Sequence, residues 1–457
     1  MDAQSDIARN ANASLTEQLA AFSASARLQD IPDSVIDRAT ISLIHNIAIA
    51  LAGRVRENAC HVMAKQHWAL PAEATLLYDG ARVSVEGAAL ANGALMHARS
   101  QDDTHAGSTS HPGAPVMAAA LAVAEAEGRS GAEFLEAVIL GYEILCRIGR
   151  DFDHLISKRG FRAAGVFGGF GAAAAAAKLM RLTPSQTAHA LGLAAQFAAG
   201  LSQVWVEGSA EYPLQLGFPA RNGILAARAA QAGVTAAREM LEGRGGFYRA
   251  YADTGEPARE ILEGLGESWQ LSEVTVKLYP VCAILQGPVG SMVQLARTEE
   301  LAPDAVERIE IRLNPFEAGY AGIDNPGPFS SSTATKMSAQ FSLAASLLDQ
   351  RLTLGDLSRL NDPAIVALAQ RVRVISDPAV APRLSELKVE MRNGRMLSNN
   401  VTAAVGQPDI PEIREFARML APEAGTNVEA MDEVTRQICA LREAASLKPL
   451  FAALGQL

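Results

Sequence analysis

The feature that most limits the fold is a helical spacing of apolar residues that persists from Ser14 to about Leu265. Alanine is the main filler of this stretch, and runs of β-branched residues are few. A period near 3.6 residues favours amphipathic helices over strands. Three capping boxes predict helix starts, at Ser34–Asp37 in an acidic variant, at Ser130–Glu133 and at Thr183–Gln186. The sequence therefore predicts an all-helical domain in this part of the chain.

The pattern changes near Trp269, where stretches with strand-like alternation alternate with helical ones. The predicted strands are Val274–Lys277, Val306–Leu313, Val372–Ile375, Leu387–Met391 and Met396–Val401. Asn393-Gly394 is typical of the turn of a hairpin between the last two. Helices are expected at Gly287–Ala296 and Ser338–Leu348, and helical spacing returns after Pro408 and ends in Val428–Leu454.

These patterns predict a mainly α fold, a large all-helical domain with an inserted, smaller α+β domain. Residues 1–268 and 403–457 form the helical domain and residues 269–402 the α+β domain. In this arrangement the C-terminal tail rejoins the first domain.

Composition restricts the class of protein. With 457 residues, 49% of them apolar and 20% charged, the chain is expected to be globular, with two or three lobes. A net charge of −10 and 5% aromatic residues argue against a nucleic-acid partner. Four dispersed cysteines fit reduced thiols in the cytoplasm. The polar N-terminus does not resemble a signal peptide, and the most apolar runs, Ile41–Gly53 and Ala163–Ala177, are too short to span a membrane, so we expect buried helices.

One loop, His97–Val116, concentrates the polar chemistry of the chain. It holds two acids, five hydroxyls and three histidines between two alanine-rich helical runs, Gly87–Met96 and Met117–Ala126. Such a loop either lies at the surface or lines a cleft, because buried polar groups need partners. Prolines 112 and 115 predict that the next helix begins here, which leaves His111 beside free backbone N–H groups suited to a carboxylate or phosphate.

Known motifs for metals, nucleotides and serine hydrolysis are missing from the sequence. The histidines and acids of the loop lack metal-site spacing, and no serine lies in a GxSxG sequence. The run Gly165–Gly171 follows no predicted strand and leads into Ala172–Ala177, so we interpret it as a helix-packing face. Other candidates each have a structural alternative, such as a helix-capping arginine or a surface tyrosine: Arg162, Tyr212, Lys277, Cys282 and Tyr320.

Taken together, these stretches resemble the MmgE/PrpD family, whose activities include 2-methylcitrate dehydratase, cis-aconitate decarboxylase and iminodisuccinate epimerase. The motifs occur in family order over most of the chain: Ala91–His97 leading to Asp102–His105, His111-Pro-Gly, Leu140–Glu143, Phe167–Gly171, Ala220–Gly223, Leu241–Gly243 with Gly246-Phe247, and Lys277–Pro280. The resemblance implies a helical domain with an inserted α+β lid, an active site between them and a homodimer. It also implies acid–base chemistry next to a carboxylate without metal or organic cofactor.

Carried over by motif, three positions keep the residue type of the family's active site: Thr104, His111 and Lys277. Tyr320 also matches by its place before Phe329–Gln340. Four positions depart. Ser100 replaces an aspartate, Arg162 a histidine and, in an ungapped comparison, Tyr212 a lysine. Cys282 occupies a position that varies.

We therefore expect an enzyme that removes a proton next to a carboxylate of a small di- or tricarboxylate. The predicted catalytic residues are His111, Lys277, Tyr320 and Tyr212. The predicted substrate-binding residues are Arg162, Thr104, Asp102, Ser100 and Cys282. Loss of a β-hydroxyl would make the enzyme a hydro-lyase and reprotonation on the other face an epimerase. A third alternative is a degenerate paralogue that only binds a carboxylate ligand.

Overall fold

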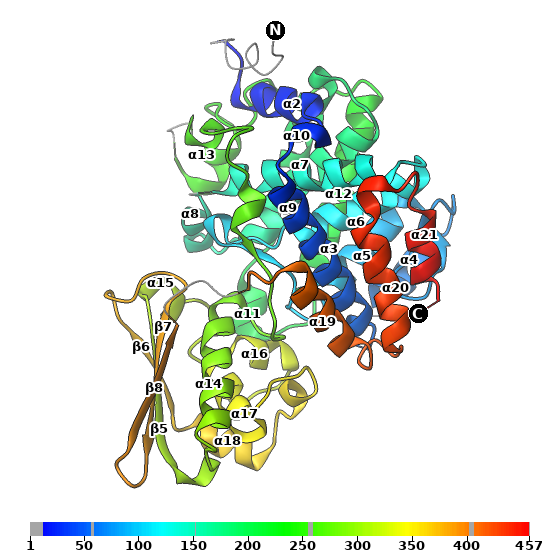
Figure 1. Cartoon of the computed structure of the whole chain (residues 1–457). Helices are drawn as coiled ribbons and strands as arrows, with labels where there is room; N and C mark the ends of the chain where they lie inside the picture. Colours follow the sequence, from blue (N-terminus) through cyan, green and yellow to red (C-terminus); the bar gives the residue numbers. More distant parts are fainter. Residues whose placement is uncertain (1–11, 56–58, 151, 255–258, 402–405, 457) are drawn as a thin grey trace.

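The computed structural model describes residues 12–55, 59–150, 152–254, 259–401 and 406–456. It divides into a helical lobe and a smaller α+β lobe (Figure 1). The main helices of the helical lobe are α2 (Leu15–Ser25), α3 (Asp33–Gly53), α4 (Ala59–His67), α5 (Val85–His97), α6 (Gly113–Ala126), α7 (Gly131–Gly149), α8 (Asp153–Lys158), α9 (Ala163–Leu179), α10 (Pro184–Ala194), α12 (Leu214–Gln231), α13 (Phe247–Ala252), α19 (Ile410–Leu420), α20 (Val428–Cys439) and α21 (Lys448–Leu454).

The α+β lobe is built on a four-stranded sheet in the order β6-β5-β7-β8. Its strands are β5 (Val306–Leu313), β6 (Val372–Ser376), β7 (Ser385–Met391) and β8 (Met396–Val401), and only the β5–β6 pair is parallel. Its helices are α14 (Gln286–Thr298), α15 (Pro315–Ala318), α16 (Ser332–Met337), α17 (Ala339–Asp349) and α18 (Pro363–Ala369), and α11 (Gln203–Glu207) lies at the junction of the lobes (Figure 1).

The buried apolar residues form two clusters that follow this division. The first runs from Leu15 to Val276 and resumes from Ile413 to Leu454, so the C-terminal helices rejoin the helical lobe. The second contains the inner face of the sheet with α14 and α17, and it also takes Val204, Trp205 and Tyr212 from the earlier part of the chain. The first cluster extends past residue 268 to Val276, and the domain boundaries at residues 268 and 402 remain a proposal.

Close helix packing around α9 explains its small residues. An added Cβ at Gly171 would lie 2.7 Å from the Gly141 carbonyl oxygen of α7, and one at Gly223 of α12 would lie 2.6 Å from the Ala173 nitrogen. Gly169 is different, because its nearest neighbour would be 3.8 Å away. The glycine-rich run is thus a helix-packing face, as predicted, although Gly169 is not needed for it.

Most predicted elements are present with small shifts of their ends. Strands β5 and β8 match the prediction, and the β7–β8 hairpin turns at Gly394, whose φ of 82° requires the left-handed region. Two of the capping boxes form, at Ser130 and Thr183. The predicted run Val428–Leu454 is broken into α20 and α21 by a 3-10 turn at Leu441–Glu443, before the new helix that Pro449 helps to start.

The predicted capping box at Ser34 is wrong. Helix α3 begins at Asp33, and its N-cap is Pro32, which makes no side-chain capping bond. Proline fixes φ, here at −57°, and Asp33 places a negative charge in the first turn, so the helix starts one residue before the serine. By length and composition α3 could cross a membrane, but 89% of its most apolar window is buried, in agreement with the predicted core helix.

The predicted strand Val274–Lys277 is shortened to β4 (Val274–Thr275). It pairs in antiparallel fashion with β3 (Thr104–His105), so that Thr104 lies opposite Thr275. A second pair of two-residue strands joins β1 (Ala74–Thr75) to β2 (Arg82–Val83). The β3–β4 pair is important for the site, because it brings Lys277 to the polar loop after α5.

Candidate active site

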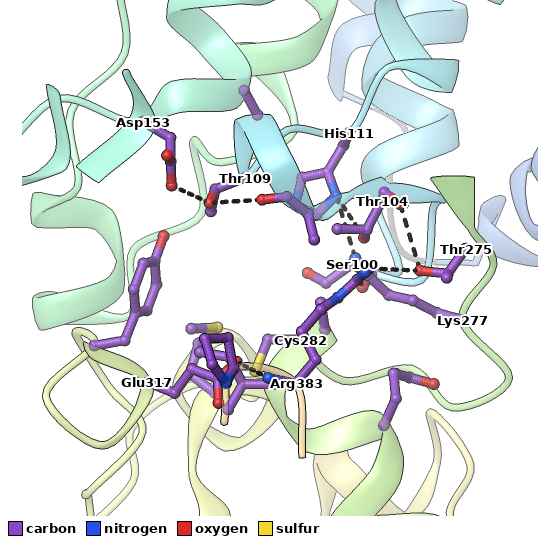
Figure 2. A pocket seen from close by; sticks show the side chains of 18 of the residues that line it. Ser100, Thr104, Thr109, His111, Asp153, Thr275, Lys277, Cys282, Glu317 and Arg383 are labelled. Atoms are coloured by element: carbon purple, nitrogen blue, oxygen red, sulfur yellow. Dashed lines mark hydrogen bonds between the residues drawn. The ribbon is translucent and has the colours of Figure 1, made fainter. Parts of the chain in front are cut away.

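A cavity of about 280 Å³ lies between the two lobes (Figure 2). Its polar and charged lining comes from both: His97, Ser100, Thr104, Thr109, His111, Asp153, Arg162, Thr275, Lys277, Cys282, Gln286, Glu317, Tyr320 and Arg383. Seven of the nine predicted site residues are part of this lining. The other two, Asp102 and Tyr212, are buried and make contact with lining residues from behind.

The polar loop after α5 is buried instead of lying at the surface. Asp102 and Asp103 have no exposed area, and Thr104 and His105 are also buried. Ser100 and Thr109 adopt positive φ angles of 55° and 45°, which non-glycine residues rarely do and which are frequent at functional sites. Of the two alternatives for this loop, the structure selects the cleft.

Asp103 occupies the N-terminus of α6. Its Oδ1 accepts a 2.9 Å hydrogen bond from the Gly113 N–H, and its other oxygen accepts one from the Tyr142 hydroxyl. The prediction that these N–H groups are free for a substrate carboxylate is therefore wrong, because a carboxylate of the chain itself fills the position. Burial raises the pKa of Asp103 to about 7. The hydrogen bond from Tyr142 lowers this pKa, and the negative charge of Asp102 raises it further.

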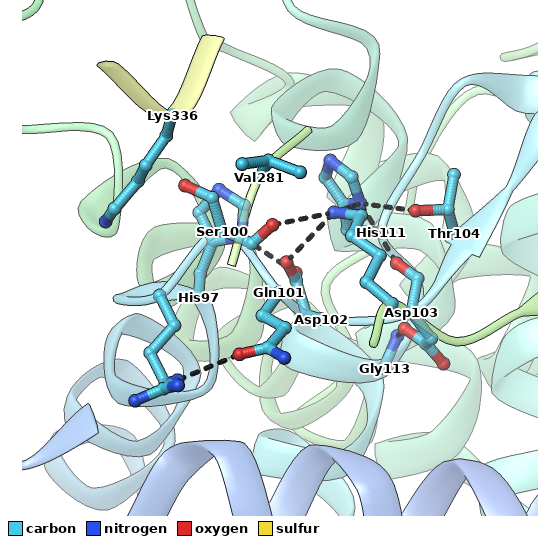
Figure 3. Close-up of polar contacts among 12 residues, drawn as sticks. His97, Ser100, Gln101, Asp102, Asp103, Thr104, His111, Gly113, Val281 and Lys336 are labelled. Atoms are coloured by element: carbon cyan, nitrogen blue, oxygen red, sulfur yellow. Dashed lines mark hydrogen bonds and ion pairs between the residues drawn. The ribbon is translucent and has the colours of Figure 1, made fainter. Parts of the chain in front are cut away.

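His111 reaches the cavity with one ring nitrogen already engaged. Its Nδ1 lies 2.9 Å from the Asp103 carbonyl oxygen and 3.2 Å from the Thr104 hydroxyl (Figure 3). A carbonyl oxygen can only accept, so this contact assigns the proton to Nδ1 and leaves the Nε2 lone pair as a base. Burial holds the pKa of His111 well below 6.5, with the Lys277 charge acting in the same direction, so the ring is neutral near pH 7.

Lys277 lies between the loop and His111. Its Nζ donates to the Ser100 carbonyl oxygen at 3.0 Å and lies 3.4 Å from Nδ1 of His111 and 3.6 Å from Oδ1 of Asp102. Burial lowers the pKa of Lys277, and the Asp102 carboxylate opposes that shift. Lys277 thus places a buried cation at the wall of the cavity beside a neutral histidine.

A chain of contacts connects Asp102 to Arg162 through His97. The His97 Nδ1 lies 2.7 Å from Asp102 Oδ2, and its Nε2 lies 2.5 Å from a terminal nitrogen of Arg162. Since guanidinium only donates, Nε2 accepts and Nδ1 donates to the carboxylate. Burial lowers the pKa of His97 to about 4, so the ring is neutral. Burial alone would raise the pKa of Asp102, but the nearby His97, His111 and Lys277 outweigh it and lower the pKa.

Arg162 is fixed on several sides. Its other terminal nitrogen donates to Gln215 Oε1 at 2.8 Å, and its guanidinium carbon lies 4.8 Å from the centre of the Trp205 ring. Burial lowers the pKa of Arg162 to about 10, so it stays charged at neutral pH. A preorganised guanidinium at a cavity wall is suited to hold a carboxylate.

Tyr212, predicted to be an acid or a base, does not line the cavity. Its hydroxyl donates to the Ala98 carbonyl oxygen and accepts a 2.7 Å hydrogen bond from Nζ of Lys336, which itself donates to Ala98. Its backbone carbonyl accepts from Arg162 at 3.3 Å. The structure therefore gives Tyr212 a place behind Arg162 and the loop, away from a ligand in the cavity.

Tyr320 and Cys282 line the cavity on the side of the α+β lobe. Burial raises the pKa of Tyr320, with the Arg162 charge acting against that, and raises the pKa of Cys282 to about 11. Both groups therefore hold their protons near pH 7. Tyr320 can serve as a proton donor, and Cys282 contributes a neutral thiol.

Several lining residues were not predicted. His97 belongs to a motif that the sequence analysis singled out, but its partner Arg162 lies far away in the sequence. Thr109 and Asp153, joined by a short hydrogen bond, lie on one side of the cavity (Figure 2). Glu317 and Arg383 come from the α+β lobe, and no sequence motif marked them. Among the described residues, no three His, Cys, Asp or Glu side chains cluster as a metal site would require.

Comparison with known proteins places the chain in a family. Residues 17–260 match the MmgE/PrpD N-terminal domain and residues 279–419 the MmgE/PrpD C-terminal domain. A cis-aconitate decarboxylase of Aspergillus terreus (strain NIH 2624 / FGSC A1156) is 30% identical over 79% of this chain and 78% of its own length.

A second cis-aconitate decarboxylase of Aspergillus terreus is 27% identical over 98% and 97% of the two chains, and the cis-aconitate decarboxylase of Homo sapiens is 25% identical over 83% and 81%. These relatives, matched over 78–97% of their own length, are named as decarboxylases, which confirms the prediction of an enzyme. Together with the two matched domains, they show that the chain belongs to the MmgE/PrpD family.

Proposed function

We propose that the protein is a lyase that acts on a small polycarboxylate of the aconitate or citrate type, by proton transfer at a carbon next to a carboxylate. The observation that carries this proposal is the neutral His111 beside the buried cation of Lys277, in a cavity that also holds Arg162. The names of the relatives, which are decarboxylases of cis-aconitate, support a lyase and a tricarboxylate.

The residues divide the work by their chemistry. Arg162 cannot act as a base. It binds a carboxylate through the N–H groups that Gln215, His97 and the Tyr212 carbonyl leave open. Lys277 stabilises the negative charge that develops when the carbon next to a carboxylate loses its proton. His111 carries that proton on Nε2, because its Nδ1 is held by the Asp103 carbonyl. Tyr320, which lines the cavity from the α+β lobe, is the proton donor.

Two lyase reactions include a proton transfer at such a carbon, the first by removing a proton and the second by adding one. In a dehydration, His111 takes the proton, the electron pair forms the C=C bond, and the β-hydroxyl leaves as water with a proton from Tyr320. In a decarboxylation of an aconitate-like acid, the C–CO₂ bond breaks, its electron pair forms a new C=C bond, and the former alkene carbon next to a carboxylate gains a proton. Ser100 and Arg162, which depart from the family pattern, favour a substrate that differs from those of typical members.

The test is proton NMR of the purified protein with cis-aconitate, citrate, 2-methylcitrate and iminodisuccinate. We expect new alkene signals from at least one acid. Lys277→Met removes the buried cation and should lower the rate by about 10²- to 10⁴-fold, the range for a group that assists proton transfer. Lys448→Met, at an exposed position of α21, is the matched control and should keep the rate. Absence of any conversion by the wild type, or full activity of Lys277→Met, would refute the proposal.

A further inference from the structure

Arg383 brings a third cation to the cavity, and it comes from the α+β lobe. It belongs to the loop between β6 and β7 and adopts a φ of 67°, a left-handed conformation that an arginine keeps only when its surroundings hold it. Its backbone N–H donates to Glu317 Oε1 at 2.9 Å. The side chain extends across the cavity to Thr275, where a terminal nitrogen lies 3.5 Å from the hydroxyl oxygen (Figure 2).

The guanidinium of Arg383 lacks a close anionic partner within the described part of the chain. No carboxylate oxygen there lies within 4.0 Å of it, and the long contact with Thr275 is its single side-chain hydrogen bond. Glu317 and Glu273 act on it only from longer range. The buried Arg147 differs, because its guanidinium donates to Glu143 and to four backbone carbonyls, whereas Arg383 is only half-buried.

Glu317 lines the same cavity, but neither of its carboxylate oxygens accepts from the Arg383 guanidinium. One accepts from the Arg383 N–H, and the other accepts from the Asn314 side chain at 2.5 Å. The second carboxyl of the lining, Asp153, is bonded by Thr109. Burial raises the pKa of both acids. The guanidinium of Arg383 therefore keeps donors that no carboxylate of the described residues occupies.

The three cations also differ in origin. Arg162 and Lys277 lie against the helical lobe, whereas Arg383 reaches in from the α+β lobe. A ligand with carboxylates at separate carbons could meet cations of both lobes at once, while a smaller diacid would leave one of them without a partner. An arginine fork with open donors fits a carboxylate better than a water molecule does.

We infer that Arg383 binds a substrate carboxylate and makes the site select tricarboxylates over dicarboxylates. This inference rests on the proposed function, since it assigns a further carboxylate of the same substrate to the same cavity. Arg383 is thus a specificity-determining residue supplied by the α+β lobe.

The test is titration calorimetry with two unreactive acids, tricarballylate and glutarate, which differ only by the central carboxylate. The wild type should bind tricarballylate more tightly than glutarate by about 10-fold or more, the effect of one charge-assisted contact. Arg383→Gln should abolish most of that ratio by weakening tricarballylate alone. Arg383→Lys should keep part of it, because a lysine keeps the charge and loses the fork. Arg392→Gln, at an exposed site beyond the other end of β7, is the control and should keep the wild-type ratio.

The outcomes separate the two claims. If Arg383→Gln and Arg383→Lys keep the wild-type ratio, or if both acids weaken equally, the role of Arg383 is refuted while the proposed function stands. If the wild type binds neither acid and converts no polycarboxylate, the proposed function fails and this inference fails with it.

Discussion

Gly113 offers a sharp test of how the loop and α6 fit together. An added Cβ there would lie 2.5 Å from the Asn46 amide nitrogen and 2.7 Å from both Asp103 Oδ1 and the Tyr142 hydroxyl. All three neighbours are buried, and Asp103 is held at the start of α6 by the Gly113 N–H and the Tyr142 hydroxyl. Gly113→Ala must push at least one of them away.

The cost can be worked from these contacts. Overpacking of a dense core costs about 1–3 kcal/mol, and a weakened hydrogen bond to a buried carboxyl adds about 1–3 kcal/mol. We therefore expect Gly113→Ala to lower the free energy of unfolding by about 2–5 kcal/mol. Because the Asp103 carbonyl also positions His111, turnover should fall as well.

Gly169→Ala in α9 is the matched control. Its added Cβ would meet nothing nearer than 3.8 Å, so the better helix propensity of alanine should leave stability unchanged or raise it by up to about 1 kcal/mol. Urea unfolding followed by tryptophan fluorescence measures both variants. At a slope near 3 kcal/mol/M, the Gly113→Ala midpoint should fall by roughly 1 M. Equal midpoints for Gly113→Ala and the wild type would refute the packing argument.

Two further predictions concern buried histidines. His45 donates from Nε2 to the Lys277 carbonyl oxygen, 2.9 Å away, because a carbonyl can only accept, and burial lowers the pKa of His45 to about 4. In the unfolded chain His45 binds a proton near pH 6.5, so the stabilisation is complete above pH 6.5 and is lost as the pH falls toward 4. Between pH 7 and 4 the free energy of unfolding of the wild type should fall by about 3 kcal/mol more than that of His45→Gln, as measured by urea titration. Equal losses would contradict this. His111→Asn keeps a donor near Nδ1 and removes the Nε2 base, so its rate in the NMR assay should fall by about 10²-fold or more with an unchanged melting temperature; a wild-type rate would exclude His111 as the proton carrier.

The fold could be predicted well because its signals are local. Helical spacing defined the elements around the loop, and the alternation of Val306–Leu313 defined β5, the central strand. The C-terminal helices were placed in the helical lobe on their apolar faces alone. The predicted capping box at Ser34 was wrong because the start of α3 depends on the preceding residue Pro32.

The site was only partly predictable, because its contacts are distant in the sequence. The loop pointed to His111, but the proton position on its ring follows from the Asp103 carbonyl. The first N–H of α6 is bonded by the Asp103 side chain, ten residues earlier in the sequence. The sequence rules for helix starts do not include so distant a partner. Two-residue strands such as β3 and β4 carry almost no sequence pattern, although they join Lys277 to the loop. Arg383 lies in a loop without any motif.

Proton transfer at a carbon next to a carboxylate is tested most directly by the position of solvent deuterium after turnover in D₂O. The wild type, supplied with the polycarboxylate that it converts, should exchange or place a single deuteron at the carbon next to a carboxylate, seen by NMR and as a one-unit mass increase. That result would support the transfer of one proton to or from that carbon. A product formed without deuterium at that carbon, and a substrate without exchange there, would contradict it.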